Sequence, residues 1–444
     1  MSTQVNFKSI NQLAIPATIS GIAEPVLNIT DTAIVGNIPV DGLESLAAAG
    51  IVGSFLSMLI WVLGQTRSSI SAIISQYLGA GRLEEVKNLP AQAIFFNIML
   101  SILVLLSTVF IIEEIFALFN ASGKILDYCI SYYSIRVWGF PLTLFTFAIF
   151  GIFRGLQNTF YPMLIAIIGA GLNIGLDFLL VYGIEGWVPA LYLDGAAWAS
   201  LMSQAVMAIM AFVLLLKKTE ISMKLTFPLN KEIKRVVFMS LNLFVRAIAL
   251  NVALIIAVRE ATSLGDRYIG AHTIAINLWL FAAFFIDGFA AAGNSMGGKL
   301  LGAGDYNGLW KLAKKVILYG MVVSVILMAF GFIFYKPIGH MFSNETAVLQ
   351  TFYGIFYIVI LGLPMNTLAF VFDGLFKGLG EMKYLRNVLL AATFLGFVPT
   401  LYLGKYLGWG FYAIWIAFVV WMMIRGFSLV WKFNQKFRPY IQNP

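Results

Sequence analysis

Apolar runs of about twenty residues recur along the whole chain and are separated only by short polar segments. Residues 91–112, 160–182, 196–216 and 317–335 are examples. About 20 apolar residues in a helix cross a hydrocarbon core of about 30 Å. The chain is 60% hydrophobic and 11% charged, whereas roughly a quarter of the residues in soluble domains are charged. The sequence therefore predicts an all-α integral membrane protein whose first partner is the lipid bilayer.

Polar breaks divide the chain into twelve expected spans. These are roughly 9–36, 46–77, 88–112, 126–153, 160–182, 193–217, 234–261, 268–298, 310–335, 347–376, 384–404 and 409–431. Most loop cations fall on one side; the exceptions are Lys124, Arg267, Lys336 and Lys405. The positive-inside rule places the basic side, with both termini, in the cytoplasm of a cell whose plasma (inner) membrane holds the protein. The net charge of +8 thus reflects topology, and no nucleic-acid partner is expected.

An internal repeat divides these spans into two sets of six. The pattern LGAG at 78–81 returns at 301–304, and GIFRGL at 151–156 returns as GLFKGL at 374–379, with the same offset along the chain in both cases. An even number of spans per repeat gives both halves the same orientation, as in secondary transporters that bind substrate between parallel repeats. We expect a first lobe at 1–217, a cytoplasmic linker at 218–233 and a second lobe at 234–444.

One carboxylate belongs to the first lobe only. Asp31 lies in the first span, and the repeat aligns it with Leu254, so the acid is not part of the shared scaffold. Ionisable groups inside a span are costly and usually face a cavity or a partner. Glu24 and Asn28 precede Asp31 by seven and three residues, which places all three on one helix face. We interpret Glu24 and Asn28 as candidate residues of a substrate or coupling cavity.

A second acid is expected at the same depth. Asn173 and Asp177 lie four residues apart in the fifth span, and Asp177 and Asp31 each lie six residues before the outer end of their span. At 1.5 Å per residue both acids lie about 9 Å below the outer surface. Two close carboxylates make a candidate proton or cation site. The alternative is that the acids cap helices or form ion pairs with Arg67 or Arg136.

The second lobe carries charged residues of its own within spans. Arg246 lies deep in the seventh span, where it pairs with Asp287 or Asp373 or lines the substrate cavity. The two acids lie in the cytoplasmic third, and the sequence leaves open whether they are functional or structural. Lys377 aligns with Arg154 at the cytoplasmic end of its span, and we expect both cations to anchor helix ends at the headgroups.

Two prolines occur inside the first span. Pro16 and Pro25 each remove a backbone hydrogen bond, so they are candidates for a hinge in the helix that carries Asp31. No catalytic constellation is present: the chain has one cysteine and two histidines and no phosphate-binding loop. We expect neither an enzyme nor an organic cofactor or firm metal site, only H⁺ or Na⁺ as the coupling ion.

Several longer motifs resemble one transporter family. These are PATISGIAEPVLNITDTAIVG at the first span, RGLQNTFYPM after the fourth, LNIGLDFLLVYG with DGAAWAS across the fifth and sixth, and DGLFKGLGEMKYLRN in the second lobe. Together they resemble the multidrug and toxic compound extrusion (MATE) transporters, in particular the DinF-like branch. The resemblance covers nearly the whole chain.

The resemblance implies a V-shaped pair of pseudo-symmetric six-helix bundles. Such a protein exports cationic or amphipathic small molecules in exchange for H⁺ or Na⁺ by alternating access, and we expect a monomer. The resemblance assigns the coupling acid to Asp31, its partners to Asn173 and Asp177, a hydroxyl to Ser200 and the bending proline to Pro16. The middle of the seventh span has no acid, which disfavours sodium coupling in the second lobe; Na⁺ at Asp31, Asn173 and Asp177 is the other option.

Rival functions are also defined by the sequence. A lipid-linked oligosaccharide flippase of the same superfamily is the alternative transporter, although such proteins usually have more spans and a more cationic cavity. A channel is disfavoured because no pore helix or filter sequence is present, and an enzyme because no metal or nucleophile constellation is.

Overall fold

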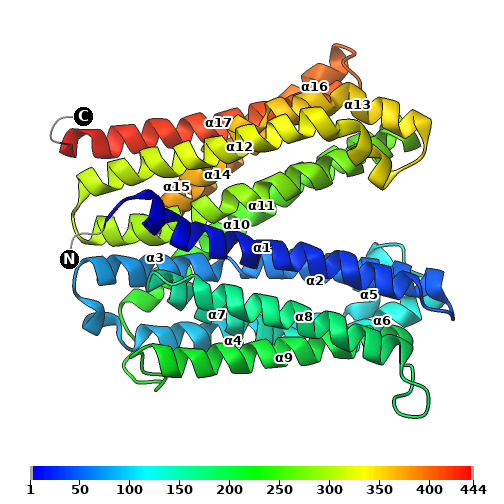
Figure 1. The fold of residues 1–444 in the computed structure, drawn as a ribbon, viewed down its shortest axis with the longest axis horizontal. Coiled ribbons are helices and arrows are strands. Elements are labelled where there is room, and N and C mark those ends of the chain that lie inside the picture. Colours follow the sequence, from blue (N-terminus) through cyan, green and yellow to red (C-terminus); the bar gives the residue numbers. More distant parts are fainter. Residues whose placement is uncertain (1–3, 442–444) are drawn as a thin grey trace. The chain divides into compact units, whose positions relative to one another are not determined.

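The computed structural model describes residues 4–441, apart from the side chains of Glu24, Pro25 and Asn28. This part of the chain is helical, and its only β-type pairing is an isolated bridge between Ile184 and Val188 (Figure 1). The first nine helices are α1 (Phe7–Gly36), α2 (Gly42–Leu63), α3 (Thr66–Gly79), α4 (Leu89–Val109), α5 (Ile112–Leu118), α6 (Lys124–Arg136), α7 (Gly139–Gly155), α8 (Phe160–Tyr182) and α9 (Tyr192–Lys218). The others are α10 (Glu232–Leu264), α11 (Asp266–Gly302), α12 (Tyr306–Phe342), α13 (Thr346–Leu361), α14 (Leu363–Gly378), α15 (Met382–Ala391), α16 (Val398–Tyr406) and α17 (Tyr412–Phe437). Three short elements complete the set: η1 (Leu83–Val86), the π-helical η2 (Ala392–Phe397) and η3 (Arg438–Tyr440).

The helices agree with the expected spans. Within the described residues, nine helical segments are long and apolar enough to cross a membrane, and two bent pairs, α6 with α7 and α13 with α14, raise the number to eleven. The 30-residue α1 is not counted among these segments, because some of its side chains lie outside the described residues. At 1.5 Å per residue it is about 45 Å long, which exceeds a hydrocarbon core. With α1, these segments follow the twelve predicted spans in order, and the prediction of an all-α membrane protein is confirmed.

The two bent spans are equivalent positions of the repeat. α6 and α7 bend by 46° and α13 and α14 by 49°. Gly139 begins α7 and Gly362 separates α13 from α14, and the offset that relates the two LGAG patterns also relates these glycines. Pro141 and Pro364 follow two residues later in each copy. Proline has no N–H to donate and its ring meets the preceding turn, which bends a helix at that point.

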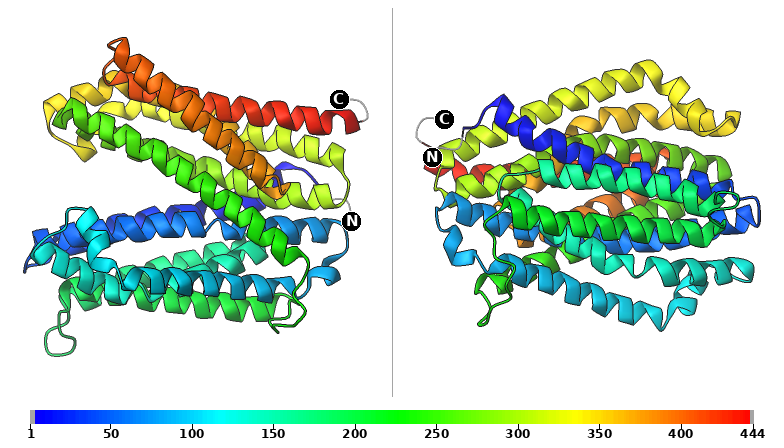
Figure 2. Two further views of the ribbon diagram at one scale, coloured as in Figure 1. Left: turned by 180° about the vertical axis from the view of Figure 1, so that it is seen from behind. Right: turned by 60° about the horizontal axis from the view of Figure 1, so that its bottom comes forward.

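Packing divides the chain into two compact units. One contains residues 19–74 and 82–237, and the other combines residues up to Thr18 with 75–81 and the chain from Phe238 onward. Helices α1, α3 and α10 are each divided between the units. Residues 219–231 form an irregular segment between α9 and α10, while the lobe limits at 217 and 234 stay a prediction. Within the first unit α8 and α9 run side by side, as both views of Figure 2 show.

The repeated GIFRGL pattern makes equivalent contacts in both halves. A Cβ placed on Gly151 would lie 2.6 Å from the carbonyl oxygen of Arg67, and one on Gly374 would lie 2.1 Å from that of Ala290. Arg67 and Ala290, like the two glycines, occupy equivalent positions of the sequence repeat. Each glycine therefore allows the backbones of two helices to approach closely, α7 to α3 and α14 to α11, as small residues do in membranes.

The two LGAG patterns pack against each other within the unit that contains the second half. A Cβ on Gly79 would lie 1.8 Å from the carbonyl oxygen of Lys299, and one on Gly302 would lie 1.9 Å from that of Gln76. These contacts are reciprocal, because each partner is the repeat equivalent of the other. The final glycine of each pattern has a φ of +68° and follows the end of its helix, a conformation that favours glycine.

We predict that Gly374→Ala destabilises the protein by about 1–3 kcal/mol, the usual cost of overpacking. The new methyl group would meet the α11 backbone, which cannot move aside as a flexible side chain can. The measurement is the thermal unfolding of the protein purified in detergent. Gly171→Ala on α8 is the matched control, since no atom lies within 4 Å of its Cβ position. Equal melting temperatures for the two variants would contradict the predicted contact.

Candidate functional site

The structure brings the predicted acids together through α1 and α8. Asn173 and Asp177 lie one turn apart on α8, where they are 5% and 0% exposed. The Asn173 side-chain N–H donates to Asp177 Oδ2 at 2.6 Å and reaches Asp31 Oδ1, on α1, at 3.5 Å. One amide thus links the two carboxyl groups within a single compact unit. The expectation that Asp31, Asn173 and Asp177 share one place is therefore met in geometry.

The two carboxyl groups also lie close to each other. Asp31 Oδ1 and Asp177 Oδ2 both lie within reach of the same Asn173 nitrogen, and within the described chain Asp177 Oδ1 has no hydrogen-bond partner. Two carboxyl groups can hydrogen-bond only when one of them carries a proton. The arrangement is therefore suited to holding one proton between an acid of α1 and an acid of α8.

Two serines from α9 line the α8 side of this site. Ser203 Oγ lies 3.4 Å from Asn173 Oδ1 and donates to the Ser200 carbonyl oxygen at 2.9 Å. Ser200, the hydroxyl that we expected here, is 1% exposed, and its Oγ has no partner in the described part of the protein. Ser203 was missed by the sequence analysis, although its position one turn after Ser200 places it on the same helix face.

The ion-pair alternative for the acids is not realised. Among the described residues no cation lies within ion-pair distance of Asp31 or Asp177. Arg67 lies against the Phe147 ring at 4.9 Å. Arg136, on α6, acts on both acids through its charge only, and its guanidinium lies 5.7 Å from the Tyr132 ring centre.

The C-terminal end of α1 is hydrogen-bonded to α8 beside the site. The Tyr182 hydroxyl donates to the Ile34 carbonyl oxygen at 2.8 Å, one turn beyond Asp31. The side chains of Glu24, Asn28 and Pro25, which we also proposed for this helix, lie outside the described residues.

The N-terminal part of α1 belongs to the other unit. α1 is continuous through Pro16, and the unit boundary follows Thr18. A Cβ on Gly288 of α11 would lie 1.9 Å from Thr18 Oγ1 and 2.6 Å from the Ala14 carbonyl oxygen. The segment around Pro16 is therefore packed tightly on α11, while Asp31 belongs to the unit that contains α8.

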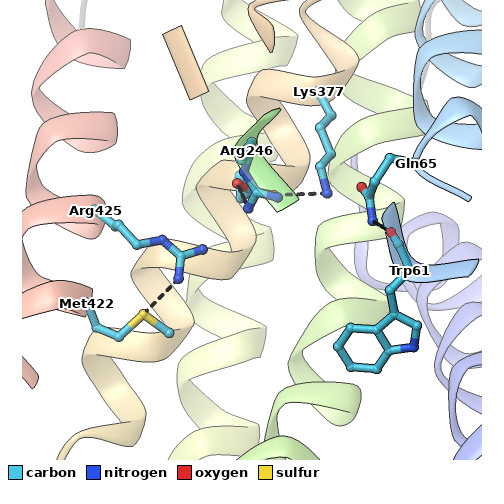
Figure 3. Close-up of polar contacts among 7 residues, drawn as sticks. Trp61, Gln65, Arg246, Lys377, Met422 and Arg425 are labelled. Atoms are coloured by element: carbon cyan, nitrogen blue, oxygen red, sulfur yellow. Dashed lines mark hydrogen bonds and ion pairs between the residues drawn. The ribbon is translucent and has the colours of Figure 1, made fainter. Parts of the chain in front are cut away.

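Arg246 lies in a separate polar cluster. Its guanidinium on α10 pairs with Asp373 on α14, one of the two acids predicted. Lys377 Nζ lies 3.0 Å from the second oxygen of Asp373, and its side chain is 18% exposed. Figure 3 shows Arg246 and Lys377 converging on one point. The prediction that Lys377 reaches the headgroups was wrong, because an acid one turn earlier on α14 holds it inside the protein.

Comparison with known proteins identifies the family to which the chain is similar. The model of the family described as MatE matches residues 16–179 and 243–402, which is more than half of the chain and includes parts of both repeats. Protein DETOXIFICATION 43 of Arabidopsis thaliana is 30% identical over 301 residues, and the chain spans only 55% of that protein's length.

Bacterial relatives match over nearly their full length. The DNA damage-inducible protein F of Escherichia coli (strain K12) is 26% identical, with 96% of this chain and 92% of that protein covered. Multidrug resistance protein NorM of Vibrio vulnificus (strain YJ016) is 23% identical, with 93% and 91% covered. A crystal structure of MATE in the bent conformation has the same fold, with a TM-score of 0.89, 21% identity, and 97% of this chain and 95% of that chain covered. The extent of the family match in both repeats, on a fold shared with solved MATE structures, shows that this chain belongs to the MatE family of membrane transporters.

Proposed function

We propose that this protein is a secondary active antiporter that exports cationic or amphipathic small molecules in exchange for protons. It would work as a monomer in the plasma (inner) membrane, with both termini in the cytoplasm. Family membership and the name of the NorM relative as a multidrug resistance protein support this class of substrate. The basic loops between the expected spans support the orientation.

The observation that carries the proposal is the closeness of Asp31 and Asp177, both of which the Asn173 side-chain N–H reaches. Asn173 turns its N–H toward the carboxylates, and its oxygen faces Ser203. A bound Na⁺ would need oxygen ligands at this point, and hard cations do not bind amide N–H groups. We therefore propose H⁺ as the coupling ion, with Na⁺ at Asp31, Asn173 and Asp177 as the alternative.

The mechanism follows from where the two acids lie. Loss of the shared proton would leave two negative charges close together in a poorly screened site, and their repulsion falls only as they separate. Asp31 and Asp177 lie on different helices, so separation moves α1 relative to α8. Because the N-terminal part of α1 packs in the other unit, we infer that Pro16 allows α1 to bend there during alternating access.

We predict that Asp31→Asn and Asp177→Asn each reduce drug efflux to the level of cells without the transporter. An amide is nearly isosteric with the acid but cannot release a proton. The measurement is ethidium efflux from cells with equal amounts of each variant in the membrane. Asp127→Asn, at an exposed position in the first turn of α6, is the control and should leave efflux unchanged. Normal efflux by either site variant would refute the assignment.

The coupling ion is tested separately. We expect the purified protein in liposomes to move ethidium against its gradient when a proton gradient is imposed, and not when a sodium gradient of equal size is imposed without one. Proton flux driven by ethidium should appear in the wild type and be absent from Asp31→Asn. If a sodium gradient alone drives ethidium movement, the coupling ion is Na⁺ and not H⁺, and it binds at the same residues.

A further inference from the structure

A second group of charged residues lies in the unit that contains the second half of the chain, and the proposed coupling mechanism does not use it. It consists of Arg246 on α10, Asp373 and Lys377 on α14, and Arg425 on α17. Arg246 and Asp373 are each 6% exposed and Arg425 is 2% exposed. Arg425 lies within the predicted span at 409–431, and the sequence predicted no role for it.

Both carboxylate oxygens of Asp373, the acid of this cluster, already have a cationic partner. Asp373 directs one oxygen to Arg246 and the other to Lys377. The charge of Arg425 also acts on Asp373, and that of Asp287 acts on Lys377 and Arg425. Both oxygens of Asp373 are thus paired, and among the described residues Arg425 forms no ion pair with it.

Arg425 is the cation of this cluster that forms no ion pair among the described residues. Its Nη1 lies 3.1 Å from Met422 Sδ, and its guanidinium lies 4.8 Å from the Trp421 ring centre and 5.5 Å from that of Phe370. Its Nη2 has no hydrogen-bond partner in the described part of the protein. In Figure 3 the side chain extends from α17 in the direction of Arg246 and Lys377.

An arginine buried in this way favours an anionic ligand. Aromatic faces stabilise a guanidinium only in part, and a buried charge without a partner is costly. The free edge of the guanidinium can donate to a carboxylate or phosphate with matching geometry.

We propose that Arg425, with Arg246 and Lys377, binds the oxyanion group of an amphiphilic molecule. The proposed transporter would then carry amphiphiles that bear a carboxylate or phosphate, including zwitterions, in addition to plain cations. The role in transport rests on the proposed function, whereas the binding site itself does not.

The test is the binding of 11-(dansylamino)undecanoic acid, a fluorescent carboxylate amphiphile, to the purified full-length protein in phosphatidylcholine nanodiscs. We expect saturable binding that is at least about tenfold weaker for the methyl ester of the probe and for Arg425→Gln, since hydrogen bonds to charged groups contribute that much. Arg438→Gln, an exposed arginine after α17, is the matched control. Equal affinities for the acid and its ester in the wild type would overturn the proposal without reference to any variant.

Two further arms separate the possible outcomes. Phosphatidylglycerol in the nanodiscs should compete with the probe if a lipid phosphate occupies the site, and dodecyl phosphate should compete if a soluble phosphate amphiphile does. Failure of all anionic amphiphiles to compete would overturn the proposal. Asp31→Asn should bind the probe with the affinity of the wild type. Measuring ethidium efflux and probe binding in this same variant therefore tests the two sites independently.

Discussion

The backbone's need for hydrogen-bond partners in lipid governs this whole structure. Because hydrocarbon offers none, spanning segments satisfy their N–H and C=O groups internally as helices. Helices in lipid gain little from the hydrophobic effect, so they associate where small residues let their backbones approach. The paired glycine contacts at Gly151 and Gly374, and the reciprocal contacts at Gly79 and Gly302, are such places in this chain.

Polar groups within the spans are confined to places where they find partners. In one unit the Asn173 side-chain N–H reaches both Asp31 and Asp177, which holds two carboxyl groups close enough to share a proton. In the other, Asp373 pairs with both Arg246 and Lys377, while Arg425 contacts Met422 and two aromatic rings and forms no ion pair among the described residues. The two clusters differ in the sign of the group that would complete them. One is suited to a proton, and the other to an anion.

The sequence predicted the span pattern and the meeting of Asp31 with Asp177, because hydropathy, helical spacing and depth are local properties. It missed Ser203 and gave Arg425 no role, and it placed Lys377 at the headgroups. A side chain's partner across helices depends on how those helices are rotated and packed, which a single sequence does not state. The bends at Gly139 and Gly362 could have been predicted from the sequence, because each copy of the repeat has a glycine followed two residues later by a proline.

The amino-acid sequence by itself determined the membrane environment, the twelve helical spans and the two-fold repeat, since each follows from composition and periodicity along one chain. Only the tertiary structure decided that α1 is divided between two compact units, that Asn173 joins acids from two helices, and that Arg425 forms no ion pair within the described part of the chain. The physical reason is that these facts are contacts between segments far apart in sequence. Such contacts are set by side-chain packing and close backbone approach rather than by local pattern.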